Sequence, residues 1–229
     1  MRRATVLPAL LFVSAFPLAA HAGSLDLRVG GFFPRAESIL FVDDAVLYQE
    51  ADGDPLTRSS WDGWTGGIQF NQPIHDLVEL GFSVDYYGRT RDTAYREFVT
   101  SSGRDIFQTL KYDIVPVGIQ LRIGPTRRGQ LSPYIAGGVD LFFWQYEEFG
   151  DFVDFDDPTN PIIPDSFISD GVATGFHVAG GVRIPVGDDF SITAEGRYQW
   201  AEDDMGEDFA GNRIDLTGAS ATLGLNLRF

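Results

Sequence analysis

Apolar side chains recur at every second position in eight separate segments of this 229-residue chain. The segments are residues 25–33, 64–70, 78–86, 115–123, 135–143, 176–184, 190–200 and 221–229. A period of two is the repeat of a β-strand, because successive side chains of a strand point to opposite faces. After the amino-terminal stretch the sequence shows no sustained period of 3.6 residues. The pattern therefore predicts an all-β chain of two-faced strands.

The connections between these segments alternate between short and long. The short ones, residues 71–76, 124–131 and 185–189, contain proline or glycine and are typical of tight turns. The long ones are residues 34–60, 88–107, 145–171 and 201–212. Each apolar face covers about nine residues, the length that a tilted strand needs to cross a bilayer. The arrangement predicts an eight-stranded antiparallel transmembrane up-and-down β-barrel with short periplasmic turns and long extracellular loops.

Parts of the long connections carry strand signals of their own. Two hairpins are predicted, one from residues 39–42 and 45–48 around Asp43-Asp44, the other from residues 95–100 and 106–110 around Ser101-Ser102-Gly103. The third long connection contains Pro158, Pro161 and Pro164 among many aspartates, which predicts an irregular segment. Pro116 lacks a ladder donor, so we expect a bulge or another local irregularity in its strand.

The amino end has the pattern of an export signal. Two arginines precede an apolar stretch at residues 5–20, and Ala20-His21-Ala22 supplies the small-x-small pattern that signal peptidase recognises. We expect cleavage after Ala22, so that residues 1–22 form a signal peptide and residues 23–229 form one outer-membrane β-barrel domain. A retained membrane anchor is the alternative, which the short, proline-interrupted apolar stretch disfavours.

The residues out of phase with the apolar faces form a second, polar set. The set comprises Asp26, Arg28, Glu79, Asp85, Arg122, Asp140, His177, Arg183, Glu195, Arg197 and Arg228, together with Gln69, Gln120 and Asn226. Buried charges persist only when they are paired or solvated, and eight strands leave an interior just wide enough for side chains. The set therefore predicts a polar network that plugs the lumen. A thin polar pathway for water, ions or small solutes is the alternative.

Acidic residues outnumber basic ones, 33 to 17, and the formal net charge is −16. This excludes nucleic acid as a partner, because neutralising phosphates requires a basic surface. The acids are concentrated in the long connections. Clustered carboxylates bind hard cations such as calcium, so a divalent-cation bridge from these loops to lipopolysaccharide phosphates is one hypothesis. A solvated acidic surface is the other.

Signals for catalysis are lacking in the sequence. There is no cysteine, no nucleotide-binding loop and no zinc-ligand spacing, so we expect neither a disulfide framework nor a cofactor. Beyond the export signal only two histidines remain. His75 falls in a predicted turn beside Asp76, and His177 points inward by phase without a serine nearby. A hydrolase needs a nucleophile within hydrogen-bond reach of its base, so we do not expect an enzyme.

Several motifs resemble those of the small outer-membrane β-barrel superfamily that includes OmpA, OmpX and OmpW. They are Pro133-Tyr134-Ile135-Ala136-Gly137-Gly138, Gly180-Gly181-Val182-Arg183, Thr193-Ala194-Glu195-Gly196-Arg197-Tyr198 and the terminal Leu-x-Leu-x-Phe. The resemblance implies an integral outer-membrane protein in contact with membrane lipid and lipopolysaccharide. It also implies that Leu223, Leu225, Leu227 and Phe229 are the signal read by the barrel-assembly machinery.

Three functions remain open on the sequence alone. The first is a structural or surface-interaction protein, a closed barrel that anchors acidic loops. The second is a small pore or an OmpW-like conduit for small solutes, although inward charges disfavour an apolar passage. The third is a soluble periplasmic lipocalin-like barrel, in which the apolar faces would point inward around a ligand.

Overall fold

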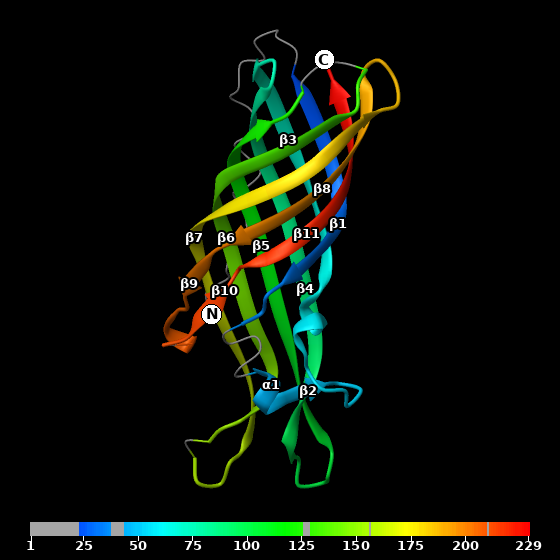
Figure 1. Cartoon of the computed structure of the whole chain (residues 1–229). Coiled ribbons are helices and arrows are strands. Elements are labelled where there is room, and N and C mark those ends of the chain that lie inside the picture. The colour runs from blue at the N-terminus through cyan, green and yellow to red at the C-terminus, as the bar shows by residue number, and fades with distance from the viewer. Residues whose placement is uncertain (1–22, 38–43, 126–128, 156, 210) are drawn as a thin grey trace.

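Eight long antiparallel strands form a closed ring in the part of the chain that the structure describes (Figure 1). The computed structural model describes residues 23–37, 44–125, 129–155, 157–209 and 211–229, so the predicted signal peptide lies outside the described residues. The strands are β1 (Ser24–Pro34), β3 (Gly63–His75), β4 (Val78–Val99), β5 (Asp105–Ile123), β6 (Ser132–Val153), β7 (Ile162–Pro185), β8 (Phe190–Trp200) and β11 (Gly218–Arg228). Each strand pairs with its neighbour in sequence, β11 pairs with β1, and β4 pairs with β5. The predicted barrel is confirmed.

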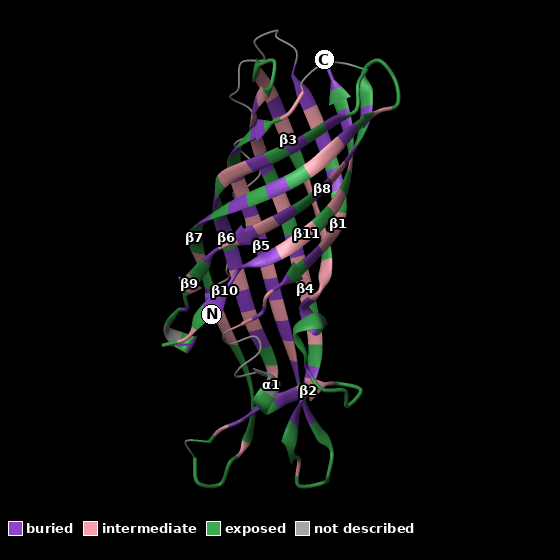
Figure 2. Ribbon diagram, viewed as in Figure 1, coloured by how far each residue is buried: buried purple, intermediate pink, exposed green. Residues whose placement is uncertain are grey.

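The apolar faces of these strands point outward. Trp64, Ile135 and Leu223 are 77%, 65% and 62% exposed, whereas Gln69 and Asn226 on the opposite faces are fully buried. Figure 2 shows this alternation along the strands. An apolar outer surface over a polar interior suits lipid, not water. The arrangement contradicts the lipocalin-like alternative. No helix among the described residues is long and apolar enough to span a membrane.

The short turns and both described chain ends lie at the same end of the barrel. Ser24 pairs with Arg228 on one side and with Asn71 on the other, which places the start of β1 beside the end of β11 and the turn after β3. The carboxyl end lies with the short turns at the top of Figure 1. The predicted sorting of short turns to one end is therefore confirmed.

Four strands continue far beyond the other four at the long-loop end. Strands β4 to β7 are 19 to 24 residues long, against 11 to 13 for β1, β3, β8 and β11. The surplus forms a protruding sheet, here called the extension, in the lower half of Figure 1. The hairpin predicted around Ser101-Ser102-Gly103 is confirmed, because Val99 pairs with Asp105.

Two loop predictions are wrong in part. Residues 45–47, predicted as a strand, belong to a helical turn, α1 (Asp44–Leu47), and residues 39–42 lie outside the described residues. The short strand that follows, β2 (Tyr48–Glu50), pairs with β4. Residues 48–50 are thus paired with the long strand β4 and not with a local hairpin partner.

The third long connection is more regular than its prolines predict. Strand β7 already begins at Ile162, and Pro164 pairs in register with Asp151 of β6. Strand β8 pairs with β7 only from Phe176 onward, so Pro164 lies where the other edge of β7 has no partner strand. A proline is tolerated at such an edge, since no ladder donor is required there.

Pro116 interrupts pairing without shifting its register. Residues 85 and 86 of β4 lack ladder partners in β5, yet Val84 and Tyr87 on either side pair in the same register with Val117 and Ile114. The expected irregularity is therefore a local gap. The remaining loop elements are η3 (Arg58–Trp61), β9 (Glu202–Asp204), η4 (Glu207–Phe209) and β10 (Arg213–Asp215), and β9 pairs with β10.

Candidate functional site in the barrel interior

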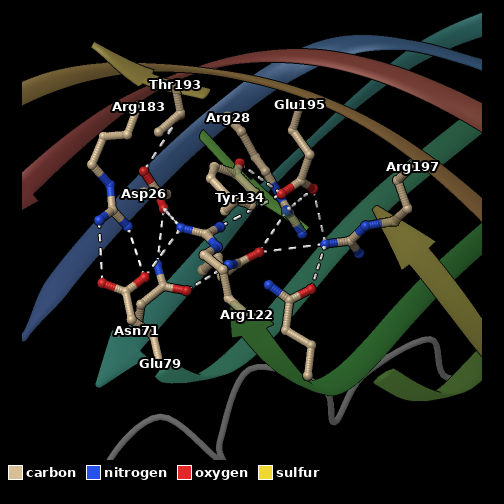
Figure 3. Close-up of polar contacts among 12 residues, drawn as sticks. Asp26, Arg28, Asn71, Glu79, Arg122, Tyr134, Arg183, Thr193, Glu195 and Arg197 are labelled. Atoms are coloured by element: carbon tan, nitrogen blue, oxygen red, sulfur yellow. Dashed lines mark hydrogen bonds and ion pairs between the residues drawn. The ribbon is translucent and has the colours of Figure 1, made fainter. Parts of the chain in front are cut away.

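The inward side chains of the short-turn half form one polar layer. Every charged residue predicted for the lumen points inward, and all are buried except Asp85, whose side chain is 13% exposed. Figure 3 shows side chains from opposite walls converging on one network. Side chains of Gln69, Asn71, Gln120 and Tyr134 join it.

Arg28 is the centre of the first group of contacts. It donates to Asp85 through Nε and Nη2 at 2.9 and 2.5 Å, to Gln69 at 2.6 Å and to Glu195 at 3.0 Å. Arg197 contacts the same two carboxylates at 3.2 and 3.5 Å. Two arginines and two acids thus form a closed set that ties β1, β4 and β8 across the lumen.

The second group is built on Glu79 and Arg122. Arg183 donates two parallel hydrogen bonds to Glu79 at 3.1 and 3.0 Å, the geometry that fixes a guanidinium most firmly. Arg122 lies 3.5 to 3.7 Å from the carboxylates of Asp26, Glu79 and Glu195. Its guanidinium also lies 3.9 Å from the centre of the Tyr134 ring, a cation–π contact. Arg122 therefore joins the two groups (Figure 3).

His177 is held by partners at both ring nitrogens. Nδ1 lies 2.5 Å from Asp140, and Nε2 lies 2.9 Å from the Gln120 side-chain oxygen, which also accepts from Arg197 at 3.4 Å. The other histidine, His75, was predicted in a turn but is the exposed last residue of β3, where its ring accepts from the Leu77 amide. Both nitrogens of His177 are thus used in structural contacts.

An aromatic layer lies beyond the polar layer, toward the long loops. Its fully buried members include Trp61, Tyr112, Phe142 and Tyr146. The Trp61 ring lies edge-on to Tyr112 and Tyr146, with centroids 6.1 and 6.5 Å apart. Sequence reasoning missed this layer. The signal was available in strand phase, because Tyr112 and Tyr146 continue the inward-facing alternation of their strands.

Trp61 reaches the barrel mouth from the first long loop. It ends η3, and its backbone carbonyl accepts from the Tyr87 hydroxyl. The preceding carbonyl, of Ser60, accepts from Arg89 at 3.2 Å, and the Ser60 hydroxyl donates to Glu50 at 2.5 Å. These contacts seat the segment as a cap over the lumen.

Little space remains between the two layers. The cavity there is about 20 Å³, room for about one water molecule. Its lining includes Arg28, Asp85 and Glu195 of the polar layer and Phe32 and Tyr87 of the aromatic layer.

Glu148 is a buried acid in the extension. It accepts from Tyr146 at 3.1 Å and from Tyr48 at 3.4 Å. Burial raises the pKa of its carboxyl to about 7. The described residues contain no group of three or more histidines, cysteines and acids arranged to hold a metal.

The model of the outer membrane protein β-barrel domain family matches residues 8–229, almost the whole chain. The chain belongs to this family. Family membership implies that the protein resides in the outer membrane. None of the curated protein sequences matches the chain.

Solved structures of other outer-membrane proteins share the architecture of this family member only loosely. Neisserial surface protein A is 14% identical with a TM-score of 0.48, and 91% of this chain and 97% of that chain are covered. For OprG from Pseudomonas aeruginosa the identity is 10%, the TM-score 0.49 and the coverage 90% and 96%. Ail of Yersinia pestis, solved with a heparin analogue, is 13% identical with a TM-score of 0.39, and 91% of this chain and 98% of that chain are covered.

The terminal row of this outer-membrane barrel lies on its outer face. Leu223, Leu225, Leu227 and Phe229 are 39% to 62% exposed. The Phe229 ring stacks on Phe70 of β3 with centroids 6.3 Å apart. The row is thus part of the apolar surface, and its role as an assembly signal stays a prediction.

Proposed function

We propose that this protein is a closed outer-membrane barrel that anchors and presents an acidic extracellular surface. One observation carries the proposal: the interior is filled twice, by paired charges near the periplasmic turns and by the aromatic layer with Trp61 at the mouth. The cavity lined by residues of both layers is about 20 Å³. A barrel filled in this way supports loops and does not conduct.

The pore alternative would need the polar layer to separate. Arg28, Arg122 and Arg197 each contact two or more carboxylates from different strands, so opening a path breaks several buried ion pairs together. An OmpW-like conduit would need an open apolar path, but in this barrel Trp61 fills the aromatic mouth. Both observations favour the closed barrel.

The proposed role does not include catalysis. A base that could activate a nucleophile is the first requirement of a hydrolase. The ring of His177 is engaged by Asp140 and Gln120, and the ring of His75, at the end of β3, accepts from the Leu77 amide.

The proposal extends to the envelope partners that the sequence suggests. Leu223, Leu225, Leu227 and Phe229 would be read by the barrel-assembly machinery, and the outer rows would contact membrane lipid and lipopolysaccharide. Divalent cations would bridge the acidic loops to lipopolysaccharide phosphates. Calorimetric titration of the refolded protein with calcium tests that bridge. The absence of any heat of binding would exclude it.

Liposome swelling tests the closed lumen. Purified protein is refolded into liposomes, its folding is checked by heat-modifiable migration on gels, and the liposomes are diluted into arabinose. We expect the swelling rate of protein-free liposomes, since no path of solute size crosses the two layers. Swelling that rises with protein content contradicts the proposal.

A further inference from the structure

An open groove lies on the outer face of the extension, away from the lumen. It has a volume of about 380 Å³. Its lining comprises Ala51, Asp92, Phe107, Gln108, Thr109, Phe149 and Gly150, contributed by the segment after β2 and by β4, β5 and β6. Phe107 and Phe149 are 50% and 40% exposed. Aromatic rings exposed at this level need a separate explanation from those of the lipid-facing rows.

A charged belt separates the groove from the lipid-facing rows. Lys111 and Asp113, on the outward face of β5, form a 2.9 Å ion pair, and Glu147 of β6 pairs in register with Lys111. Charges on the outer face are unfavourable in the hydrocarbon core, so this belt lies at or above the membrane surface. Phe107 precedes Lys111 by four residues in β5, which places it about 13 Å farther from the barrel than the belt at 3.3 Å per residue. The groove therefore faces the outside of the cell and not the lipid.

Gly150 keeps the floor of the groove free of side chains. It has a φ of 146°, a conformation that residues with a side chain rarely adopt. A Cβ here would meet the Phe107 carbonyl oxygen at 2.5 Å, so β5 and β6 approach closely at this point. The apolar part of the groove's lining is formed by the rings of Phe107 and Phe149 and by Ala51.

The charge at the groove is negative. The exposed Asp92 carboxylate accepts from the Thr109 hydroxyl at 2.9 Å, which holds it at the groove. Asp151, also exposed, follows Gly150 directly. No basic residue lines the groove, and the nearest cation on the outward face of β5, Lys111, is paired with Asp113. Apolar surface beside carboxylates is complementary to a ligand that is both apolar and cationic.

We propose that this groove binds a cationic amphipathic segment of a partner protein. Apolar side chains of the segment would contact Phe107 and Phe149, and its Lys or Arg side chains would pair with Asp92 and Asp151. In the absence of a bridging divalent cation, the same carboxylates would repel lipopolysaccharide phosphates, and they would repel the acidic groove of a second copy. The inference rests on the proposed surface role, but it is independent of whether the lumen is closed.

Fluorescence anisotropy with a labelled peptide tests this inference. The protein is placed in phosphatidylcholine nanodiscs, and the probe is a short peptide in which Lys alternates with Phe and Leu. We expect saturable binding that weakens with added salt, while the same peptide with Glu in place of Lys does not bind. Phe107→Ser with Phe149→Ser should weaken binding about tenfold or more, the loss typical of an aromatic anchor. Asp92→Asn with Asp151→Asn should weaken it and flatten its salt dependence.

Matched variants outside the groove guard against non-specific attraction. Phe155→Ser removes another exposed ring, and Asp204→Asn removes an exposed acid on β9. Both should leave the affinity unchanged. Equal loss in these controls, binding of the Glu peptide, or unchanged binding by the groove variants overturns the inference. The inference is also overturned if the wild-type protein binds lipopolysaccharide micelles, or dimerises, and the groove variants abolish that binding or dimerisation. Liposome swelling bears on the lumen alone, so the two proposals fail separately.

Discussion

Arg183 and Glu79 face each other across the interior through two hydrogen bonds, and both are buried. Removing one partner leaves the other charge unpaired inside the barrel, which costs about 3–5 kcal/mol. Glu79→Gln should therefore lower the free energy of unfolding by about that amount, measured by urea unfolding in lipid vesicles. Adding Arg183→Gln should recover part of the loss. The exposed contacts of Glu202 with Arg35 and Arg213 are the control, since Glu202→Gln should change stability by at most about 1 kcal/mol. Equal effects at Glu79 and Glu202 would contradict the account.

Glu148 gives a pH dependence with a defined sign. Its pKa is about 7, above the usual 4.5, so between these values the folded state binds the proton more tightly than the unfolded state. Packing around Glu148 should be most stable below pH 4.5, weaken as the pH rises to about 7, and then change little. Hydrogen exchange of the β2 amides at pH 5 and pH 8 measures this. In Glu148→Gln the protection factors, which are exchange rates corrected for the intrinsic pH dependence of amide exchange, should be equal at both values. A difference in protection that survives in this variant would refute the assignment.

Strand phase was sufficient to predict which charges lie inside. Asp26, Arg122 and Glu195 were placed in the lumen by alternation alone, because a strand side chain has only two directions to point. Their partners did not follow from phase. That Arg122 lies against Tyr134, or that His177 contacts Gln120, depends on strand stagger around the ring, which no local pattern encodes.

At the scale of elements, the cap formed by η3 is the feature most open to test. Trp61 is fully buried against Tyr112 and Tyr146. Trp61→Ala should cost about 3–5 kcal/mol locally, because it leaves a large cavity. We expect faster proteolysis in residues 50–62, and slower proteolysis again when indole is added to refill the cavity. Trp64→Ala is the control, since that ring is 77% exposed on the lipid face. Equal protease sensitivity of both variants would argue against the cap.

The elements that sequence misjudged are those fixed by long-range pairing. Pro164 predicts an irregular segment, but it lies in β7, because β6 provides a partner on one edge and the other edge has no partner strand there. Residues 45–47 alternate like a strand, yet only Tyr48–Glu50 finds a free edge on β4. The place of Trp61 could not be predicted for a related reason: it lies far in sequence from Tyr112 and Tyr146, against which it packs.

At the scale of the whole molecule, alternation, loop lengths and outward apolar rows all indicate the same β-barrel, a closed ring of strands. The family match and the pairing of β4 with β5 agree with them. Pattern predicts the wall of such a protein well, because every strand repeats one rule. Pattern predicts the packing of the lumen poorly. The same paired charges can form a plug or line a path, and contacts across the lumen decide between the two.

Single-channel recording in planar bilayers tests the closed lumen most directly. Folded protein, verified by heat-modifiable migration on gels, is added to a bilayer under an applied voltage. Two filled layers with about 20 Å³ between them predict a flat current at the level of the protein-free bilayer. Stable, discrete current steps that increase in number with added protein would contradict the closed barrel.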